Sequence, residues 1–257
     1  MSLSPFSLKG RTALVTGGNG GIGRAIALGL RSAGSRVVVT GRNPEKNAAM
    51  ATELGEDGVA IQLDVRDEDA VRQSVSDVVA KFGSLDILIN NAGIVLGGSV
   101  LEMSREEWDA VIETNLTGSF LCAKHAARAM VAAGNGGKII NIGSVFSVYG
   151  TPEFVEYGSS KAGVLGLTRG LAVELAPHYI QVNAILPGWY ETDMTEDSRS
   201  SPVAETIRRK TPAARWGQPE DLVGASIFLA SAASSFVTGV ALPVDGGYLI
   251  MERLASD

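Results

Sequence analysis

A serine, a tyrosine and a lysine in the second half of the chain could together transfer a proton at neutral pH. Tyr157 and Lys161 stand four positions apart, so on a helix their side chains would lie on one face. A phenol has an ordinary pKa of about 10, and a nearby ammonium group lowers that pKa because it favours the phenolate. Ser144 could hydrogen-bond a substrate oxygen while Tyr157 supplies or removes the proton. The tyrosine–lysine spacing also arises in ordinary amphipathic helices, so the pair alone leaves that alternative open.

A glycine-dense turn near the start of the chain could bind a phosphate group. Residues 17–23 read GGNGGIG, between an apolar run at 12–16 and a helix-like segment at 24–30. Because glycines lack side chains, a phosphate can approach the backbone N–H groups, and the following helix N-terminus adds positive potential. Two patterns fit, the general G-x-G-x-x-G fingerprint from Gly18 and a narrower G-x-x-x-G-x-G from Gly17. A turn without a ligand is the alternative, although glycine weakens helices and strands wherever nothing requires it.

Alternating strands and helices must position these residues. Apolar strand-like runs are predicted at residues 12–16, 37–40, 59–63, 85–90, 138–142, 181–186 and 240–243. Helical composition marks residues 24–30, 44–54, 68–82, 105–133, 157–176 and 219–230. The strand-like runs lack polar alternation, which is typical of strands covered by helices on both faces. Residues 1–257 are therefore predicted to form one α/β domain, a doubly wound Rossmann-type fold with a seven-stranded parallel sheet.

One segment of this domain has the composition of a loop. Residues 188–212 follow the sixth predicted strand and are rich in Ser, Thr, Asp and Glu, with prolines at 202 and 212. Long loops in compact domains are often lids or binding elements. We expect a substrate loop or lid here, with a purely solvated excursion as the alternative.

Composition excludes several classes of function. A net charge of −6 and a pI of about 5.1 argue against a nucleic-acid surface. Cys122 is the single cysteine and His125 and His178 are the two histidines, so neither an internal disulfide nor a zinc site is expected. No apolar run reaches the roughly eighteen residues of a membrane span. The sequence predicts a cytoplasmic protein with no metal site and no nucleic-acid or membrane partner.

Taken together, the motifs resemble the short-chain dehydrogenase/reductase family. The glycine pattern after Thr16, the serine at a strand end and the run YGSSKA at residues 157–162 carry this resemblance. It continues in register from about Phe6 to Tyr248. Further matches are Asp64-Val65, Asn91-Ala92-Gly93, Asn115, Pro187-Gly188, Thr192 and Asp245-Gly246-Gly247.

The resemblance implies a secondary alcohol/ketone oxidoreductase in which each matched residue has a role. Tyr157 is implied to be the general acid or base and Ser144 to orient the substrate oxygen. Lys161 is implied to lower the Tyr157 pKa and to hold the nicotinamide ribose. Asn115 is implied to hold a water in a proton relay, with a tie between a helix and a strand as the alternative, and Asp64 could simply cap the following turn. The implied cofactor-binding residues are Gly17, Asn19, Gly21, Ile22, Gly23, Arg42, Asp64, Val65, Asn91, Ala92, Gly93, Tyr157, Lys161, Pro187, Gly188 and Thr192.

The end of the second predicted strand favours NADP(H) over NAD(H). An acidic residue is expected there in NAD-binding folds, where it hydrogen-bonds the ribose 2′-hydroxyl. The sequence reads Thr40-Gly41-Arg42-Asn43 instead, and the Arg42 guanidinium could pair with a 2′-phosphate. Many NADP-using relatives also carry a basic residue in the glycine turn, where this chain has Asn19. Stacking of Arg42 on the adenine is the alternative.

The substrate wall is expected from residues 94–98, 145–154 and 189–195. Val145, Phe154 and Trp189 are the predicted substrate contacts. The opening PFSLKG at residues 5–10 resembles sugar-acid and polyol dehydrogenases of the family. A sugar-acid carboxylate requires a basic anchor, and the predicted wall contains no Arg or Lys, which favours neutral sugars, polyols or small ketones.

Two other functions and an assembly are also considered. A 3-oxoacyl-carrier-protein reductase would require a basic patch at the cleft mouth, for which Arg128 and Arg169 are candidates. A non-catalytic dinucleotide-binding sensor belongs to a different class, and retention of Tyr157 and Lys161 argues against it. The resemblance implies a homotetramer, with a dimer as the alternative, built through the helices predicted at 105–133 and 157–176.

Overall fold

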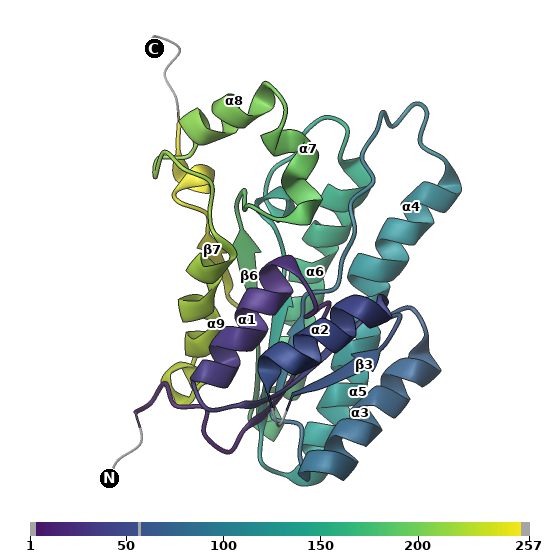
Figure 1. Ribbon diagram of the computed structural model, residues 1–257, viewed down its shortest axis with the longest axis vertical. Helices are drawn as coiled ribbons and strands as arrows, with labels where there is room; N and C mark the ends of the chain where they lie inside the picture. The colour runs from purple at the N-terminus through teal and green to yellow at the C-terminus, as the bar shows by residue number, and fades with distance from the viewer. Residues whose placement is uncertain (1–3, 56–57, 253–257) are drawn as a thin grey trace.

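Seven parallel strands form one sheet in the computed structural model, which describes residues 4–55 and 58–252 (Figure 1). Their order across the sheet is β3-β2-β1-β4-β5-β6-β7, so the winding reverses between β1 and β4. The chain segments that leave the carboxyl ends of β1 and β4 therefore run in opposite directions across the sheet. Ligands bind in such sheets at the crevice between these two ends. The predicted α/β, doubly wound fold is confirmed. The strands are β1 (Thr12–Thr16), β2 (Arg36–Gly41), β3 (Val59–Gln62), β4 (Ile87–Asn90), β5 (Gly137–Ile142), β6 (Ile180–Pro187) and β7 (Ala241–Val244).

Helices cover both faces of the sheet. On one face, Val15 and Ile89 pack in a cluster with α1 (Gly21–Ser32), α2 (Pro44–Leu54) and α9 (Val223–Ala230). On the other face, Leu14 and Leu88 pack with residues of α3 (Glu68–Phe82), α5 (Gly118–Ala133) and α6 (Val155–Leu175). Because the central strands are buried on both sides, both of their faces are apolar, which explains the continuous apolar runs in the sequence.

The single helix predicted over residues 105–133 is instead two helices joined by a π-helical turn. α4 (Arg105–Ile112) begins with a capping box formed by Ser104 and Glu107, and the turn Glu113–Thr117 leads into α5. Helical composition continues through all three parts, so periodicity could not reveal the wider turn. Such turns are often found at functional sites, and this one contains Asn115.

The segment 188–212 is not the irregular loop that its composition suggests. It contains α7 (Glu196–Arg199) and α8 (Val203–Lys210), which Figure 1 shows in green above the end of β6. Its Ser, Thr, Asp and Glu residues serve as helix caps and first turns: Thr192 and Thr195 form a capping box, and Glu196 opens α7. Its basic residues close α8, where they favour the negative end of the helix dipole.

Within residues 4–55 and 58–252, no helix is both long and apolar enough to cross a membrane. In the same part of the chain, no group of three or more His, Cys, Asp or Glu side chains is placed to hold a metal ion.

Candidate active site

The carboxyl ends of the strands open into a cleft of about 350 Å³. It is bounded by the glycine turn, by the segments that follow β4 and β6, and by the end of β5. Every residue predicted to bind the cofactor lines this cleft, and Ser144 lines it as well. Asp193 and Met194 also line it, within the range 189–195 that the sequence assigned to the substrate wall.

The glycine turn leaves the start of α1 open to the cleft. Gly20 is the N-cap of α1 and provides no side-chain cap. The first backbone N–H groups of the helix can therefore donate hydrogen bonds to an anion. A Cβ atom at Gly23 would stand 2.3 Å from the carbonyl oxygen of Gly17, and one at Gly17 would stand 3.0 Å from the Ala92 Cα. Side chains are therefore excluded at these two positions, which fits the pyrophosphate of a dinucleotide.

Asn91 fixes the shape of this turn. Its side-chain amide donates to the carbonyl oxygens of Thr16 and Gly17, each at a distance of 3.0 Å. The Thr16 hydroxyl in turn accepts hydrogen bonds from the backbone N–H groups of Asn91 and Ala92. Asn91 therefore joins the end of β1 to the end of β4, and its contribution to the cleft is to hold the backbone of both segments.

The serine, tyrosine and lysine of the predicted proton-transfer group lie together. Ser144 follows β5, while Tyr157 and Lys161 stand in the first two turns of α6. The Lys161 Nζ lies 5.6 Å from the centre of the Tyr157 ring and donates to the carbonyl oxygen of Ile142 over 2.8 Å. Three elements, β5, the turn after it and α6, thus bring the group to one end of the cleft.

Burial dominates the ionisation of this group. Burial raises the pKa of Tyr157 to about 12, and the neighbouring Ser144 hydroxyl offsets only part of that rise. Burial also lowers the pKa of Lys161 to about 8. The phenol therefore keeps its proton at neutral pH, and the lowering of the Tyr157 pKa by Lys161 stays a prediction.

Asn115 lies behind the cleft rather than in its lining. It is 1% exposed, its Oδ1 accepts from the Ile94 N–H at 2.8 Å, and its Nδ2 donates to the Ile94 carbonyl at 2.9 Å. The same Nδ2 donates to the Ser160 hydroxyl, next to Lys161, at 3.0 Å. Asn115 therefore ties the segment after β4 to α6, the alternative that the sequence left open, and the water relay stays a prediction.

The three predicted substrate contacts form a layer beside the cleft. Val145, Phe154 and Trp189 do not line it but pack around Phe146, whose ring centre lies 5.8 Å from that of Tyr157. Phe146 also lies 5.6 Å from Phe154 and 5.7 Å from Trp189, between ring centres. Phe146 and the aromatic rings around it therefore form an aromatic wall next to Tyr157. The three predicted residues pack in this wall and do not line the cleft.

Sequence reasoning missed two residues of this wall. Tyr248, from the turn after β7, lies 5.9 Å from Tyr149 between ring centres. Lys210, the last residue of α8, places its ammonium 5.0 Å from the Tyr149 ring centre and 4.5 Å from that of Tyr248. The predicted ranges contain no Lys or Arg, and α8 brings Lys210 to these aromatic rings from outside those ranges. The basic end of α8 was the only available signal.

Glu156, next to Tyr157 in the chain, is completely buried. Its Oε1 accepts from the backbone N–H of Gly97 at 2.9 Å, and its Oε2 has no hydrogen-bond partner among the described residues. Gly97 belongs to the predicted substrate wall and has a positive φ of 74°. Glu156 therefore holds the segment after β4 against α6.

At the opposite end of the cleft, the polar side chains are held by their neighbours. Asp64 pairs with Arg66 at 2.6 Å, which holds the pKa of that carboxyl below its usual range and caps the following turn. Asn19 donates to Asn47 at 2.7 Å. Arg42 lines the cleft from an exposed position directly after β2.

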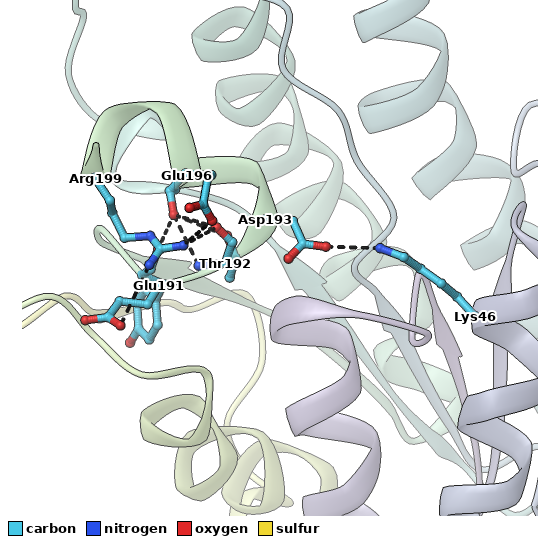
Figure 2. A network of polar contacts seen from close by, with 8 residues as sticks. Lys46, Glu191, Thr192, Asp193, Glu196 and Arg199 are labelled. Carbon is cyan, nitrogen blue, oxygen red and sulfur yellow. Dashed lines mark hydrogen bonds and ion pairs between the residues drawn. The ribbon is translucent and has the colours of Figure 1, made fainter. Parts of the chain in front are cut away.

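Figure 2 shows the polar contacts that hold the segment after β6. Arg199 of α7 donates to the Thr192 carbonyl at 3.4 Å and to Glu196 at 2.8 Å. Asp193, in the same segment, pairs with Lys46 of α2 at 3.0 Å. Because both partners of this last pair are largely exposed, it contributes little stability and can open readily.

Comparisons with known proteins show that the chain is similar to dehydrogenases and reductases. The family model described as enoyl-(acyl carrier protein) reductase, a short-chain dehydrogenase/reductase model, matches residues 17–249. A 2-dehydro-3-deoxy-D-gluconate 5-dehydrogenase of Escherichia coli is 42% identical over 97% of this chain and 99% of its own length. A 3-oxoacyl-[acyl-carrier-protein] reductase of Synechocystis is 41% identical over 95% of this chain and 99% of its own. The crystal structure of a gluconate 5-dehydrogenase from Burkholderia cenocepacia, in complex with NADP and tartrate, superposes with a TM-score of 0.92 at 40% identity, covering 96% of this chain and 98% of that one.

Proposed function

Because the chain belongs to the short-chain dehydrogenase/reductase family, we propose that it interconverts the secondary alcohol and the ketone of a sugar acid, with NADP(H) as its hydride carrier. One observation carries the proposal. A single cleft holds an anion-binding glycine turn at one end and Ser144, Tyr157 and Lys161 at the other.

In the reductive direction, the chain's own residues handle the oxygen of the substrate and one proton. The Ser144 hydroxyl hydrogen-bonds the carbonyl oxygen, and the Tyr157 phenol donates its proton to that oxygen. Lys161 stabilises the phenolate that remains, since its ammonium lies 5.6 Å from the ring centre. A bound nicotinamide cofactor supplies the hydride in this direction and accepts it in the other.

Two features support NADP(H) rather than NAD(H). The residue after β2 is Arg42, which lines the cleft, and no carboxylate stands there to meet a ribose 2′-hydroxyl. The Burkholderia relative was crystallised with NADP. The same relative and the Escherichia coli enzyme, by their names, act on sugar acids, which supports that substrate class for this chain.

The experiment that tests the function compares the wild type with Tyr157→Phe. Removal of the phenol hydroxyl is expected to lower the turnover of a sugar acid by about 10²- to 10⁴-fold, because one proton donor is lost. NADPH binding, followed by fluorescence titration, is expected to survive. Turnover near the wild-type level would exclude Tyr157 as the acid–base group.

A second candidate is a 3-oxoacyl-carrier-protein reductase, which the Synechocystis relative favours. The basic last turn of α8 is the feature that an acidic carrier would meet. An assay of gluconate oxidation against reduction of an acetoacetyl thioester separates the two functions. Preferential turnover of the thioester would replace the sugar-acid proposal.

We also propose a cytoplasmic homotetramer. Phe120 and Val131 of α5 and Val155 and Val173 of α6 are exposed apolar side chains on helices that could pair across a two-fold axis. Light scattering after size-exclusion chromatography measures the assembly. A monomeric mass would contradict the proposal.

A further inference from the structure

The ammonium of Lys210 is held at the aromatic wall. It lies over the rings of Tyr248 and Tyr149, at 4.5 and 5.0 Å from their centres, a geometry in which the cation is attracted to the ring faces. Among the described residues, Lys210 makes no ion pair, whereas Arg208 in the same turn pairs with Glu205 at 2.6 Å. The charge of Lys210 is therefore positioned but not neutralised.

Two buried donors stand beside this charge. The indole N–H of Trp189 and the hydroxyl of Tyr149 are both inaccessible to solvent and have no hydrogen-bond partner within the described part of the chain. An indole nitrogen can only donate, and a buried donor without an acceptor is costly and rare in folded proteins. Burial also raises the pKa of Tyr149 above its ordinary value, so its hydroxyl keeps the proton that it could donate.

Within the described residues, Asp245 is the carboxylate whose charge raises the Tyr149 pKa, and it is already engaged. Its two oxygens accept hydrogen bonds from the backbone N–H groups of Gly247 and Leu249, each at 2.8 Å. Lys210, Tyr149 and Trp189 therefore present donors and positive charge without a carboxylate of their own.

This donor cluster stands one aromatic ring away from the acid–base group. Phe146 contacts Tyr149, Trp189 and Tyr157, with ring centres 5.4, 5.7 and 5.8 Å away. The donor cluster and Tyr157 therefore contact the same ring.

We propose that Lys210, Tyr149 and Trp189 form a carboxylate subsite, which binds the acid group of a sugar-acid substrate while the reacting carbon lies at Ser144 and Tyr157. A carboxylate provides two oxygens that can accept from all three donors. The inference rests on the proposed function and extends it, because it assigns the preference for acids over neutral polyols to named residues. Lys210 ends α8, so a bound acid also fastens the segment 188–212 to the wall.

The test measures binding of gluconate and of sorbitol, a neutral polyol of the same carbon number, to the full-length chain by calorimetry with NADPH present. In Lys210→Met, gluconate is expected to bind about 10- to 100-fold more weakly, the range for a lost charge-assisted hydrogen bond, with sorbitol little changed. Lys210→Arg is expected to restore part of the affinity. Lys81→Met is the matched control, since Lys81 also lies over an aromatic ring, that of Phe82 on α3.

A second variant guards against misfolding. Tyr149→Phe removes one donor and keeps the ring under Lys210, and it is expected to raise the KM for gluconate several-fold with kcat nearly unchanged. Equal weakening of gluconate and sorbitol in Lys210→Met, or no weakening of gluconate, would overturn the subsite. Failure of the wild type to bind gluconate would also overturn it, and turnover of a neutral secondary alcohol would then show that the oxidoreductase function itself stands.

Discussion

The Lys161 ammonium donates to the carbonyl oxygen of Ile142 over 2.8 Å, and this bond joins α6 to the last residue of β5. Ile142 is fixed within the sheet by its pairing with Ile185 on β6. The bond therefore sets the position of the charge beside Tyr157 with the rigidity of the sheet rather than that of a loop. It also allows a lysine to remain in a site where burial lowers its pKa to about 8.

Stability is predicted to rise with pH as Lys161 deprotonates. Its folded pKa of about 8 lies below the ordinary value of 10.5, so between these values the unfolded chain binds more protons than the folded one. Lys161 should therefore contribute an increase in the free energy of unfolding from pH 8 to about pH 10, and urea unfolding of the wild type and of Lys161→Met at several pH values measures that contribution. Lys161→Met should remove part of this rise, and Lys138→Met another part, because burial also lowers the Lys138 pKa to about 8. An unchanged slope in Lys161→Met would contradict the prediction.

Arg42 is predicted to select the phosphorylated cofactor. Arg42→Ala should weaken NADPH binding by about 10- to 100-fold, as expected when a charge-assisted hydrogen bond to a phosphate is lost, and NADH binding far less. Fluorescence titration with both nucleotides measures the difference. Arg72→Ala, which removes an exposed arginine paired with Asp69 on α3, is the matched control. Equal losses for NADPH and NADH would indicate stacking on the adenine instead.

Glu156 is predicted to stabilise the wall through Gly97. Glu156→Ala leaves the Gly97 N–H without its acceptor and should lower the free energy of unfolding by about 1–3 kcal/mol. Glu156→Gln keeps a carbonyl acceptor at the same place, so it should be clearly less damaging. Chemical denaturation measures the free energy of unfolding of the two variants. Similar losses of stability in both would show that the negative charge, rather than the hydrogen bond, is required.

Gly23 is predicted to be required for the turn itself. In Gly23→Ala the new methyl group would overlap the carbonyl oxygen of Gly17, so the backbone must shift, with an expected loss of about 1–3 kcal/mol and much weaker NADPH binding. Gly224→Ala on α9 is the control, since a Cβ there meets nothing within 4 Å. That control should gain up to about 1 kcal/mol, because alanine favours the helix. Comparable stability of the two variants would show that the turn tolerates a side chain.

The sheet and the cleft could be predicted because their signals are local. Apolar runs mark strands that are buried on both faces, and the glycines of residues 17–23 mark a turn that no side chain can enter. The four-residue spacing of Tyr157 and Lys161 was enough to place them on one face of α6. Parallel strands then bring their carboxyl ends to one edge, which gathers the predicted residues without any knowledge of packing.

The remaining features depend on contacts between distant parts of the chain. Lys210 reaches the wall only because α8 folds over Tyr149, and the Asp64 carboxylate pairs with Arg66 at the edge of the cleft that Asp64 lines. Asn115 is polar within a helical segment, and its partners Ile94 and Ser160 are known only once the helices are packed. Composition misread residues 188–212 because serine, threonine and acidic residues are as common in helix caps as in loops.

The π-helical turn at Glu113–Thr117 makes the site sensitive to the length of the chain as well as to its residue types. A π-helical turn contains one residue more than an α-helical turn. Deletion of one residue there would close the wide turn into an ordinary α-helical one, so the residues of the turn would change the face of the helix that they occupy. Asn115 would then no longer face Ile94 and Ser160, although every functional side chain would still be encoded. Insertions and deletions at this point are therefore expected to be as harmful as replacement of the asparagine.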